Sequence, residues 1–292
     1  EVMSYSCFFF SQMKRGKKFF SAKFWKYAIL FNIPLIPHYL SNSILGSSDR
    51  IMIQNMVGVS EAGIYSLAYS ISQIMQLVNE SLNKTMSPWL YQKIREKDYK
   101  RMSKVVYPSL ILISAANLAL IAVAPEVVAV FAPVEYRDAI YVIPPVAMSL
   151  FFTYLYLCFA PFEFYFEKRI WTTIGTLTSA AANIILNFIF IRLCGYQAAG
   201  YTTLFCYALN ALMHYFFMRK VCKAYLDDIK PYNPNVIMGI AATFMGLGFL
   251  YIPTYSHPII RYSLTVLLLI ILVINRKRMM EVFSALVKKK ES

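Results

Sequence analysis

The chain has 292 residues, of which 58% are apolar and 15% are charged, and its mean hydropathy is +0.51. A soluble domain of this length cannot bury so much apolar surface, so the composition excludes an ordinary soluble protein and predicts a membrane protein. The net charge is +14, and its meaning depends on where the basic residues lie relative to the apolar segments.

Apolar segments of about 20 residues, the length that crosses a bilayer as a helix, recur along the whole chain. The first residue is Glu1, and the first ten residues read as the end of a hydrophobic helix, so we expect an N-terminal part of the protein to precede them. We predict an all-α transmembrane bundle with one truncated span followed by eight complete ones, at residues 1–10, 25–47, 61–86, 105–131, 138–162, 170–191, 198–218, 235–253 and 259–275.

Basic residues gather in every second connection between these spans. One set of connections holds 24 of the 29 Lys and Arg residues, at positions 12–26, 91–104, 163–169, 219–234 and after 275. The other set holds only Arg50, Arg137, Arg192 and Arg261. Because Lys and Arg are retained on the cytoplasmic side, we expect the first set and the C-terminus to be cytoplasmic. The charge therefore indicates topology and attraction to lipid headgroups, and we expect no nucleic acid partner.

The residue types that carry membrane-enzyme chemistry do not cluster in this sequence. His38, His214 and His257 lie in different segments without a ligand-spaced partner, and a lone His in a membrane helix is most often an interhelical hydrogen-bonding group. The chain has no P-loop, and its five cysteines lack CxxC spacing. We therefore expect no catalytic residue, no metal site and no cofactor.

The clearest polar pattern lies in the span 61–86. Five polar residues recur there at steps of mostly three and four, so they share one face of the helix: Gln73, Gln76, Glu80, Asn83 and Lys84. Polar groups inside a membrane helix cost free energy unless they face other helices or a water-filled cavity. The stripe therefore indicates a cavity wall or, equally, an interfacial Glu80 and Lys84 ion pair from which Lys84 reaches the cytoplasmic surface.

The preceding span, 25–47, contains Pro34 and Pro37, which remove backbone donors and predict a bent or broken helix. Such interruptions occur at substrate sites and hinges of transporters, and also as simple packing kinks. Asp49 and Arg50 follow at the outer end, either as an anion-binding or gating pair or, more commonly for such positions, as an exposed ion pair.

Further polar residues occur in pairs one helical turn apart, each of which either faces a cavity or joins two helices: Asn183 with Asn187, and Asn210 with His214. Glu163 and Glu167 follow the span 138–162 beside two basic residues. We expect both acids to lie in a solvated cytoplasmic loop.

Residues 48–94 and the segment before them resemble bacterial oligosaccharide-lipid flippases, the polysaccharide exporter branch of the multidrug/oligosaccharidyl-lipid/polysaccharide exporter superfamily. The matching features are IPLIPHYLS at Ile33–Ser41, then Asp49 and Arg50, then Glu61-Ala62-Gly63-Ile64-Tyr65 opening the next span, and Pro88-Trp89 before a basic loop. Their order and spacing, together with the topology, carry the resemblance.

The resemblance implies a transporter of two six-helix lobes with two additional C-terminal helices. On that pattern this chain is the C-terminal part, divided as 1–10 (end of an N-terminal-lobe helix), 11–24 (basic linker), 25–220 (C-terminal lobe), 221–234 (cytoplasmic loop), 235–275 (two additional helices) and 276–292 (basic tail). Its N-terminal lobe is then missing, and the isolated 292 residues are not expected to transport.

The resemblance also implies a function. Alternating access would carry the headgroup of a polyprenyl-pyrophosphate-linked oligosaccharide from the cytoplasmic to the outer face of the bacterial cytoplasmic membrane, for polysaccharide biosynthesis. The polysaccharide polymerase machinery is a possible further partner. On this reading Arg50 and Lys84 bind phosphate and Pro34 and Pro37 are hinges, while sugar hydroxyls contact His38, Asn42, Gln73, Gln76, Glu80 and Asn83.

Three alternatives remain open on the sequence. A cation-coupled multidrug exporter of the same superfamily needs buried carboxylates, and the spans contain few acids, Glu80 and Glu126. A membrane glycosyltransferase, ligase or polymerase acting on lipid-linked sugars needs acidic or His residues on a sizeable outer loop, and the predicted outer loops are short. A structural or assembly protein is disfavoured by the polar stripe.

Overall fold

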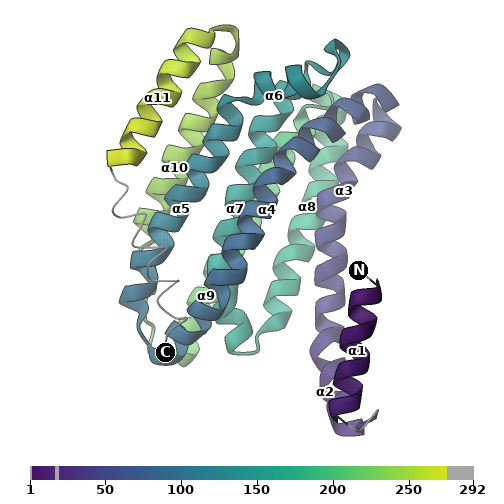
Figure 1. The fold of residues 1–292 in the computed structure, drawn as a ribbon, viewed down its shortest axis with the longest axis vertical. Helices are drawn as coiled ribbons and strands as arrows, with labels where there is room; N and C mark the ends of the chain where they lie inside the picture. Colours follow the sequence, from purple (N-terminus) through teal and green to yellow (C-terminus); the bar gives the residue numbers. More distant parts are fainter. Residues whose placement is uncertain (1, 17–19, 275–292) are drawn as a thin grey trace.

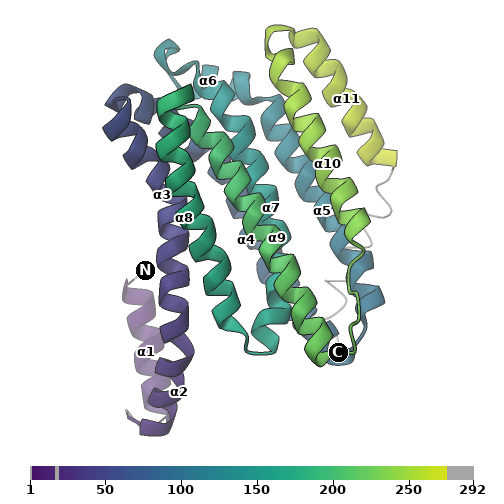
Figure 2. The same cartoon turned by 180° about the vertical axis from the view of Figure 1, so that it is seen from behind.

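The computed structural model describes residues 2–16 and 20–274, and within them the chain forms helices and no strands. The predicted all-α class is therefore confirmed. The helices, shown in Figures 1 and 2, are α1 (Val2–Gly16), α2 (Ala22–Asn32), η1 (Ile33–Leu35), α3 (Ile36–Met56), α4 (Val59–Glu96), α5 (Tyr99–Ala122), α6 (Ala124–Phe131), η2 (Val134–Tyr136), α7 (Ala139–Tyr165), α8 (Arg169–Cys194), α9 (Ala198–Tyr225), α10 (Pro234–Tyr251), η3 (Ile252–Ser256) and α11 (Pro258–Ile274).

Each of the eight complete spans predicted from hydropathy corresponds to one or two of these helices. Among the described residues, four helical segments are long and apolar enough to cross a membrane: Tyr99–Ala122, Ala139–Tyr165, Arg169–Cys194 and Pro234–Ser256. Helices α3, α4 and α9 are also long enough to cross a membrane, but they contain more polar side chains and tyrosines than these four segments. That these three also cross the membrane stays a prediction. The basic tail, 276–292, lies outside the described residues.

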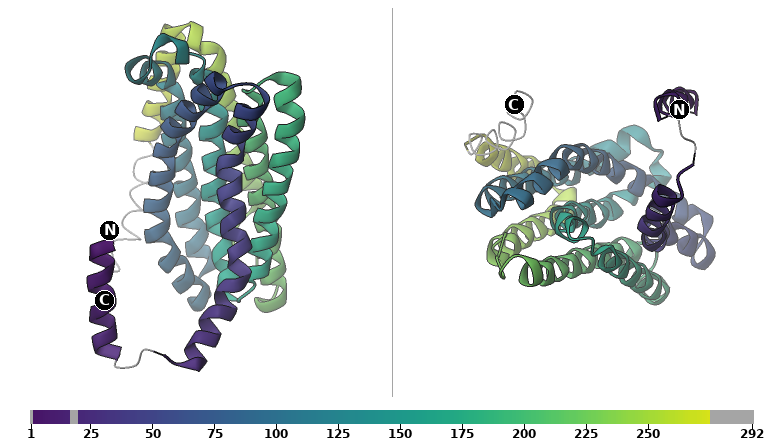
Figure 3. Two further views of the ribbon diagram at one scale, coloured as in Figure 1. Left: turned by 90° about the vertical axis from the view of Figure 1, so that its right-hand side faces the viewer. Right: turned by 90° about the horizontal axis from the view of Figure 1, so that it is seen from below.

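Prolines divide two of the predicted spans. Helix α2 ends at Asn32, a short 3₁₀ turn containing Pro34 follows, and α3 begins with Pro37 in its first turn, so the predicted interruption is confirmed. Figure 3 shows α2 turned away from the axis of α3. The single span predicted over 105–131 is wrong, because the helix breaks at Val123 and Pro125 opens α6, where its missing N–H costs no hydrogen bond.

Two helices extend beyond their predicted ends. Helix α4 continues to Glu96, and its 38 residues span about 57 Å, well over the roughly 30 Å of bilayer hydrocarbon. The Asp98 side chain then accepts a hydrogen bond from the Arg101 backbone N–H, 3.2 Å away, and caps α5. Most of the predicted 91–104 loop is therefore helix, and only Lys97 and Asp98 form the turn between α4 and α5. Helix α1 likewise continues to Gly16, into the predicted linker.

Helix α7 lies at the centre of the bundle and packs against α4, α5, α8 and α9, while α3 packs along α8 and α10 lies along α5 (Figures 1 and 2). The side chains of α7 are apolar around almost the whole helix, which is the pattern of a helix buried on all sides. The ring centroids of Phe151 on α7 and Phe244 on α10 lie 4.7 Å apart, and both residues belong to the largest hydrophobic cluster of the described residues. Helix α7 therefore positions α4, α8 and α9, which carry much of the polar network described below.

The closest approach of α9 to α7 depends on Gly200. A Cβ placed there would lie 2.9 Å from Cγ of the Pro145 ring, which cannot rotate away. We expect Gly200→Ala to lower the free energy of unfolding by about 1 to 3 kcal/mol, the usual cost of overpacking. Denaturation of the purified protein measures this, with Gly239→Ala on α10 as control because no atom lies within 4 Å of a Cβ there. Equal losses in both variants would contradict the close α7 to α9 contact.

Candidate functional site

The polar stripe predicted on α4 lies beside the buried side of that helix and extends from it to the exposed side. The buried side carries Ser72 and Asn79, and the Asn79 side-chain amide donates to the Leu150 carbonyl of α7 at 2.8 Å. The residues of the stripe are half-buried or exposed in this chain: Gln73, Gln76 and Asn83 are half-buried, and Glu80 and Lys84 are exposed. The stripe is thus free to face a ligand, water or another part of a larger protein.

The ion pair between Glu80 and Lys84, one of the two readings of the stripe, is not formed in the structure. Among the described residues no ion pair joins Glu80 to Lys84; instead Glu80 accepts a hydrogen bond from the Gln76 side chain at 3.3 Å. The amide one turn before Glu80 satisfies the carboxylate, and the Lys84 ammonium stays in the exposed surroundings of the stripe. Lys84 therefore has its charge available for an anionic partner.

Of the candidates on α3, His38 is buried and Asn42 is exposed. The Asn42 amide lies 3.2 Å from His38 Nε2, and His38 Nδ1 lies 3.0 Å from the Thr176 hydroxyl of α8. A neutral imidazole that accepts from Asn42 and donates to Thr176 satisfies both contacts. The ring thus joins α3 to α8, and Asn42 is the part of this pair that a ligand can reach.

Arg50 and Asp49 do not form the exposed pair considered from the sequence. Arg50 is half-buried, donates to the Gly46 carbonyl at 2.9 Å and lies over the Tyr69 ring of α4, 4.9 Å from its centroid. Asp49 is 1% exposed and faces α8 and α9. Neighbours on a helix point about 100° apart, which is why only one of the two side chains reaches the interior.

Asp49 is the acceptor at the centre of a buried polar network, here termed the Asp49 centre. Its two carboxylate oxygens accept from the Tyr65 hydroxyl at 2.6 Å, the Thr203 hydroxyl at 2.7 Å and the Asn187 amide at 2.6 Å. Around these lie Ser48, Asn183 and Thr202, each hydrogen-bonded to a member of the network. The Asn183 and Asn187 pair thus joins helices, one of its two predicted roles, and the network ties α3, α4, α8 and α9 together.

A second buried network, the Glu163 centre, consists of Glu163 on α7, Thr172 on α8 and His214 on α9. Glu163 and His214 are both fully buried, and Glu163 Oε1 lies 2.7 Å from His214 Nδ1. The Thr172 hydroxyl donates to Glu163 Oε2 at 3.0 Å. The prediction that Glu163 lies in a solvated loop is therefore wrong, because α7 continues through Tyr165 and carries the side chain inward. Glu167 is exposed, as predicted.

The predicted candidates thus remain in two groups, one on α3 and one on α4. Among the described residues no hydrogen bond or ion pair joins a candidate of one group to a candidate of the other, although Arg50 on α3 lies over the Tyr69 ring of α4. No three His, Cys, Asp or Glu side chains of the described residues gather closely enough to hold a metal ion.

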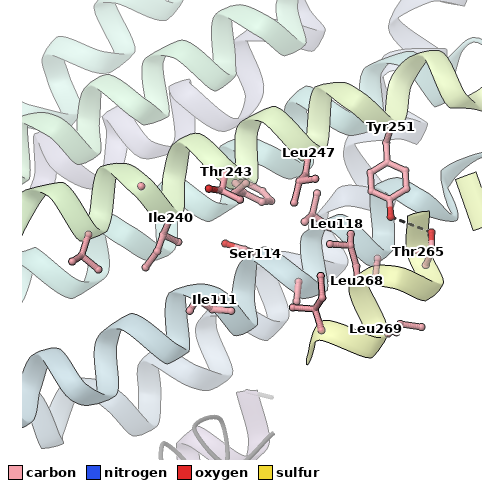
Figure 4. A pocket seen from close by; sticks show the side chains of 16 residues that line it. Ile111, Ser114, Leu118, Ile240, Thr243, Leu247, Tyr251, Thr265, Leu268 and Leu269 are labelled. Atoms are coloured by element: carbon pink, nitrogen blue, oxygen red, sulfur yellow. Dashed lines mark hydrogen bonds between the residues drawn. The ribbon is translucent and has the colours of Figure 1, made fainter. Parts of the chain in front are cut away.

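A pocket lies away from these candidates, between α5, α10 and α11 (Figure 4). It has a volume of about 540 Å³, and its walls are mostly aliphatic, such as Ile111, Leu118 and Leu247. The Tyr251 and Thr265 hydroxyls, 3.1 Å apart, hydrogen-bond to each other at one end. This pocket suits hydrocarbon chains, and it contains none of the residues predicted to bind sugar or phosphate.

Comparison with known proteins gives matches in the N-terminal third of the chain. Residues 1–94 match the family of polysaccharide biosynthesis proteins. A protein named for the Lsg locus of Haemophilus influenzae is 30% identical over 87 residues, which are 30% of this chain and 21% of that relative. No solved structure matches. The chain thus matches about a fifth of the length of this relative.

The family match spans the segment from α1 to nearly the end of α4. It includes Asp49, Arg50 and the α4 stripe, so the resemblance expected from the sequence is confirmed over this part of the chain. Together with the apolar helices, the match indicates a multi-pass membrane protein related to polysaccharide synthesis.

Proposed function

We propose that this chain is part of a flippase that moves polyprenyl-pyrophosphate-linked oligosaccharide from the cytoplasmic to the outer face of the bacterial cytoplasmic membrane. The observation that carries the proposal is that the segment matching the polysaccharide biosynthesis family, residues 1–94, is also the segment with the half-buried to exposed polar stripe on α4. A polar stripe at membrane depth needs a polar partner, and a sugar headgroup in transit is one.

The chemistry of the headgroup matches the candidates. A sugar pyrophosphate crosses hydrocarbon very slowly, so side chains must replace its water, and cations must offset its phosphate charge. Arg50, which is held over Tyr69, and the unpaired ammonium of Lys84 supply the cations. Amide and carboxylate groups of Asn42, Gln76 and Glu80 supply hydrogen bonds for sugar hydroxyls, as do those of Gln73 and Asn83.

The interruption between α2 and α3 supports a movable element at Pro34 and Pro37. Alternating access requires one segment to change its angle relative to the rest, and a helix that is already broken changes angle at low cost. Transport also requires a second lobe, so we expect the 292 residues alone to leave the lipid-linked sugar where it is.

Sided detection of the lipid-linked intermediate tests the proposal. In cells that lack the complete gene, we expect single repeat units on polyprenyl pyrophosphate to accumulate on the cytoplasmic face, as measured by mass spectrometry and by protection from an impermeant lectin. An unpolymerised unit on the outer face would instead favour a glycosyltransferase or polymerase. Normal outward display would overturn flipping by this protein.

One observation favours a second candidate, a cation-coupled exporter of small molecules. From the sequence we expected few acids inside the spans, namely Glu80 and Glu126. In the structure Asp49 and Glu163 are also buried carboxylates. Their oxygens contact Tyr65, Thr203 and Asn187 or Thr172 and His214, and both carboxylates are buried between helices, where a cationic drug does not reach them. The exporter therefore ranks second to the flippase.

A further inference from the structure

The two basic residues of the proposed site lie at opposite ends of the α4 stripe. Arg50 lies over the Tyr69 ring, 4.9 Å from its centroid. Tyr69 precedes Gln73 by one helical turn, so it continues the face of the stripe, which extends to Lys84. Lys84 comes 15 positions after Tyr69 in the same helix, a distance of about 22 Å along its axis. One end of the stripe thus carries a guanidinium and the other an ammonium.

A single pyrophosphate does not reach from one of these cations to the other. It is only a few ångströms long, and a lysine side chain that extends along the helix covers only part of the distance. Between Tyr69 and Lys84 the sequence has no Lys or Arg, and α3 has none other than Arg50. The wall formed by α3 and α4 therefore offers positive charge to a phosphate at two separate places.

The segment of the stripe between these places suits a sugar better than a phosphate. Glu80 carries the carboxylate of the stripe, and its partner is the neutral amide of Gln76, at 3.3 Å. A carboxylate repels a phosphate, but it accepts hydrogen bonds from sugar hydroxyls. A pyrophosphate is thus attracted to either end of the stripe and repelled between them.

The packing around Arg50 holds its guanidinium in place. Arg50 donates to the Gly46 carbonyl at 2.9 Å, and a Cβ on Gly46 would lie 3.2 Å from the Tyr69 hydroxyl oxygen. The Tyr69 ring stacks on that of Tyr65, with centroids 6.4 Å apart, and Tyr65 donates to Asp49. A guanidinium has several N–H donors, and the bond to Gly46 uses one of them. Tyr69 therefore positions Arg50, whose other donors remain for a phosphate.

The two cations also differ in their depth on the topology expected from the basic connections. The turn after Glu96 is then cytoplasmic, and the start of α4 lies at the outer face. From that start Tyr69 lies about 15 Å along the helix and Lys84 about 37 Å, compared with roughly 30 Å of bilayer hydrocarbon. On this topology Arg50 lies at membrane depth, and the exposed Lys84 lies at the cytoplasmic surface.

We propose that the pyrophosphate of the lipid-linked sugar binds at two successive sites. It binds first at Lys84, the entry site, and then at Arg50, the inner site, with Tyr69 as the residue that positions Arg50. The amides and the carboxylate of the stripe bind the sugar while the phosphate passes between the two sites. This inference rests on the proposed function and adds to it the number of phosphate sites and their order.

Binding of inorganic pyrophosphate to the complete protein, measured by titration calorimetry, tests whether the sites are separate. Lys84→Ala is expected to weaken one class of site at least about tenfold and to leave the other, and Arg50→Ala to do the reverse. Lys100→Ala, which changes an exposed basic residue outside the stripe, is the matched control and keeps both classes. Loss of all binding in either single variant, or unchanged binding in both, would overturn the two sites.

The calorimetry requires no transport, so it distinguishes this inference from the proposed function. Two separate pyrophosphate sites in a complete protein that does not flip the lipid-linked sugar would contradict the flippase, but not the separation of the sites. Flipping by a protein with one shared site would contradict the inference and leave the flippase.

Flipping rates at increasing density of the lipid-linked oligosaccharide test the order of the sites. The complete protein is oriented in proteoliposomes, and the substrate is supplied to the leaflet on its cytoplasmic side. Lys84→Ala is expected to raise the apparent KM at least about tenfold with little change in the maximal rate, because Lys84 assists entry. Arg50→Ala is expected to lower the maximal rate by a similar factor with little change in KM. Equal changes of the same parameter in both variants would overturn the order.

Variants of Tyr69 test its positioning role. Tyr69→Phe keeps the ring under Arg50 and is expected to keep the maximal rate, whereas Tyr69→Leu removes the ring and is expected to lower the rate as Arg50→Ala does. In the Arg50→Ala background Tyr69→Leu should have no further effect, because the guanidinium that it positions is absent. An equal further loss in that background, or equal losses in Tyr69→Phe and Tyr69→Leu, would contradict the positioning role.

Discussion

Asp49→Ala is expected to lower the free energy of unfolding by about 3 to 5 kcal/mol, the largest stability loss that we predict for a single substitution in this chain. The variant removes the acceptor of three buried donors, on Tyr65, Asn187 and Thr203, and leaves the Asn187 amide only its longer bond to Asn183. Each unsatisfied buried donor costs about 1 to 3 kcal/mol, and partial rearrangement recovers some of that cost.

Denaturant unfolding of the purified protein in detergent measures this loss. Asp49→Asn is expected to fall between the wild type and Asp49→Ala, because it keeps an acceptor oxygen but turns an amide donor toward another donor. Glu135→Ala, an exposed acid near the start of α7, is the control and is expected to change stability by less than about 0.5 kcal/mol. Wild-type stability in Asp49→Ala would show that the four helices are held together without this network.

Arg50→Ala and Lys84→Ala are each expected to reduce translocation of lipid-linked oligosaccharide at least about tenfold, the effect of losing one charge-assisted contact to phosphate. Neither residue forms an ion pair among the described residues, so both charges remain available to an anion. For the same reason neither variant should prevent insertion into the membrane or lower its amount there.

Complementation of a deletion strain with the complete gene measures this effect, with surface polysaccharide as the readout and the membrane content of each variant determined by immunoblotting. Lys100→Ala is the matched control, because Lys100 is an exposed basic residue beyond the turn after α4. Wild-type polysaccharide in both Arg50→Ala and Lys84→Ala would remove these residues from the proposed site.

Hydropathy predicted most of the fold because span length and apolar content are local properties. The eight complete spans correspond to helices of the structure, and the interruption at Pro34 and Pro37 follows from the missing backbone donors. The two helices whose ends differ from the prediction also have local causes, which a hydropathy average over about 20 residues does not show. Pro125 divides α5 from α6 after Val123, and α4 continues through a polar segment that resembles a loop in a hydropathy profile.

The buried acids were not predictable in the same way. Asp49 lies next to Arg50 at the end of a span, and Glu163 lies among charged residues after one, so each resembles a surface residue in the sequence. Their burial depends on partners far along the chain, since Thr203 and His214 lie 154 and 51 residues away. The pairs of polar residues one turn apart on α8 and α9 were the available signal: Asn183 and Asn187 belong to the Asp49 centre, and His214 belongs to the Glu163 centre.

The polar stripe on α4 was predictable from its three- and four-residue steps, but its partner was not. The buried face of the same helix also carries polar groups, and only packing against α7 distinguishes Asn79 from its neighbours Gln76 and Asn83. Whether the stripe binds a sugar headgroup depends on what lies opposite to it, which no pattern within these 292 residues specifies.

The most direct test of the central claim, flipping of a lipid-linked oligosaccharide, uses the complete protein in proteoliposomes. A polyprenyl-pyrophosphate oligosaccharide is placed in both leaflets, and the fraction that an impermeant glycosidase can reach is followed over time. The account predicts that the protected inner fraction becomes accessible with the wild-type protein and much more slowly with Lys84→Ala. A protected fraction that stays constant at one half with the wild-type protein would contradict it.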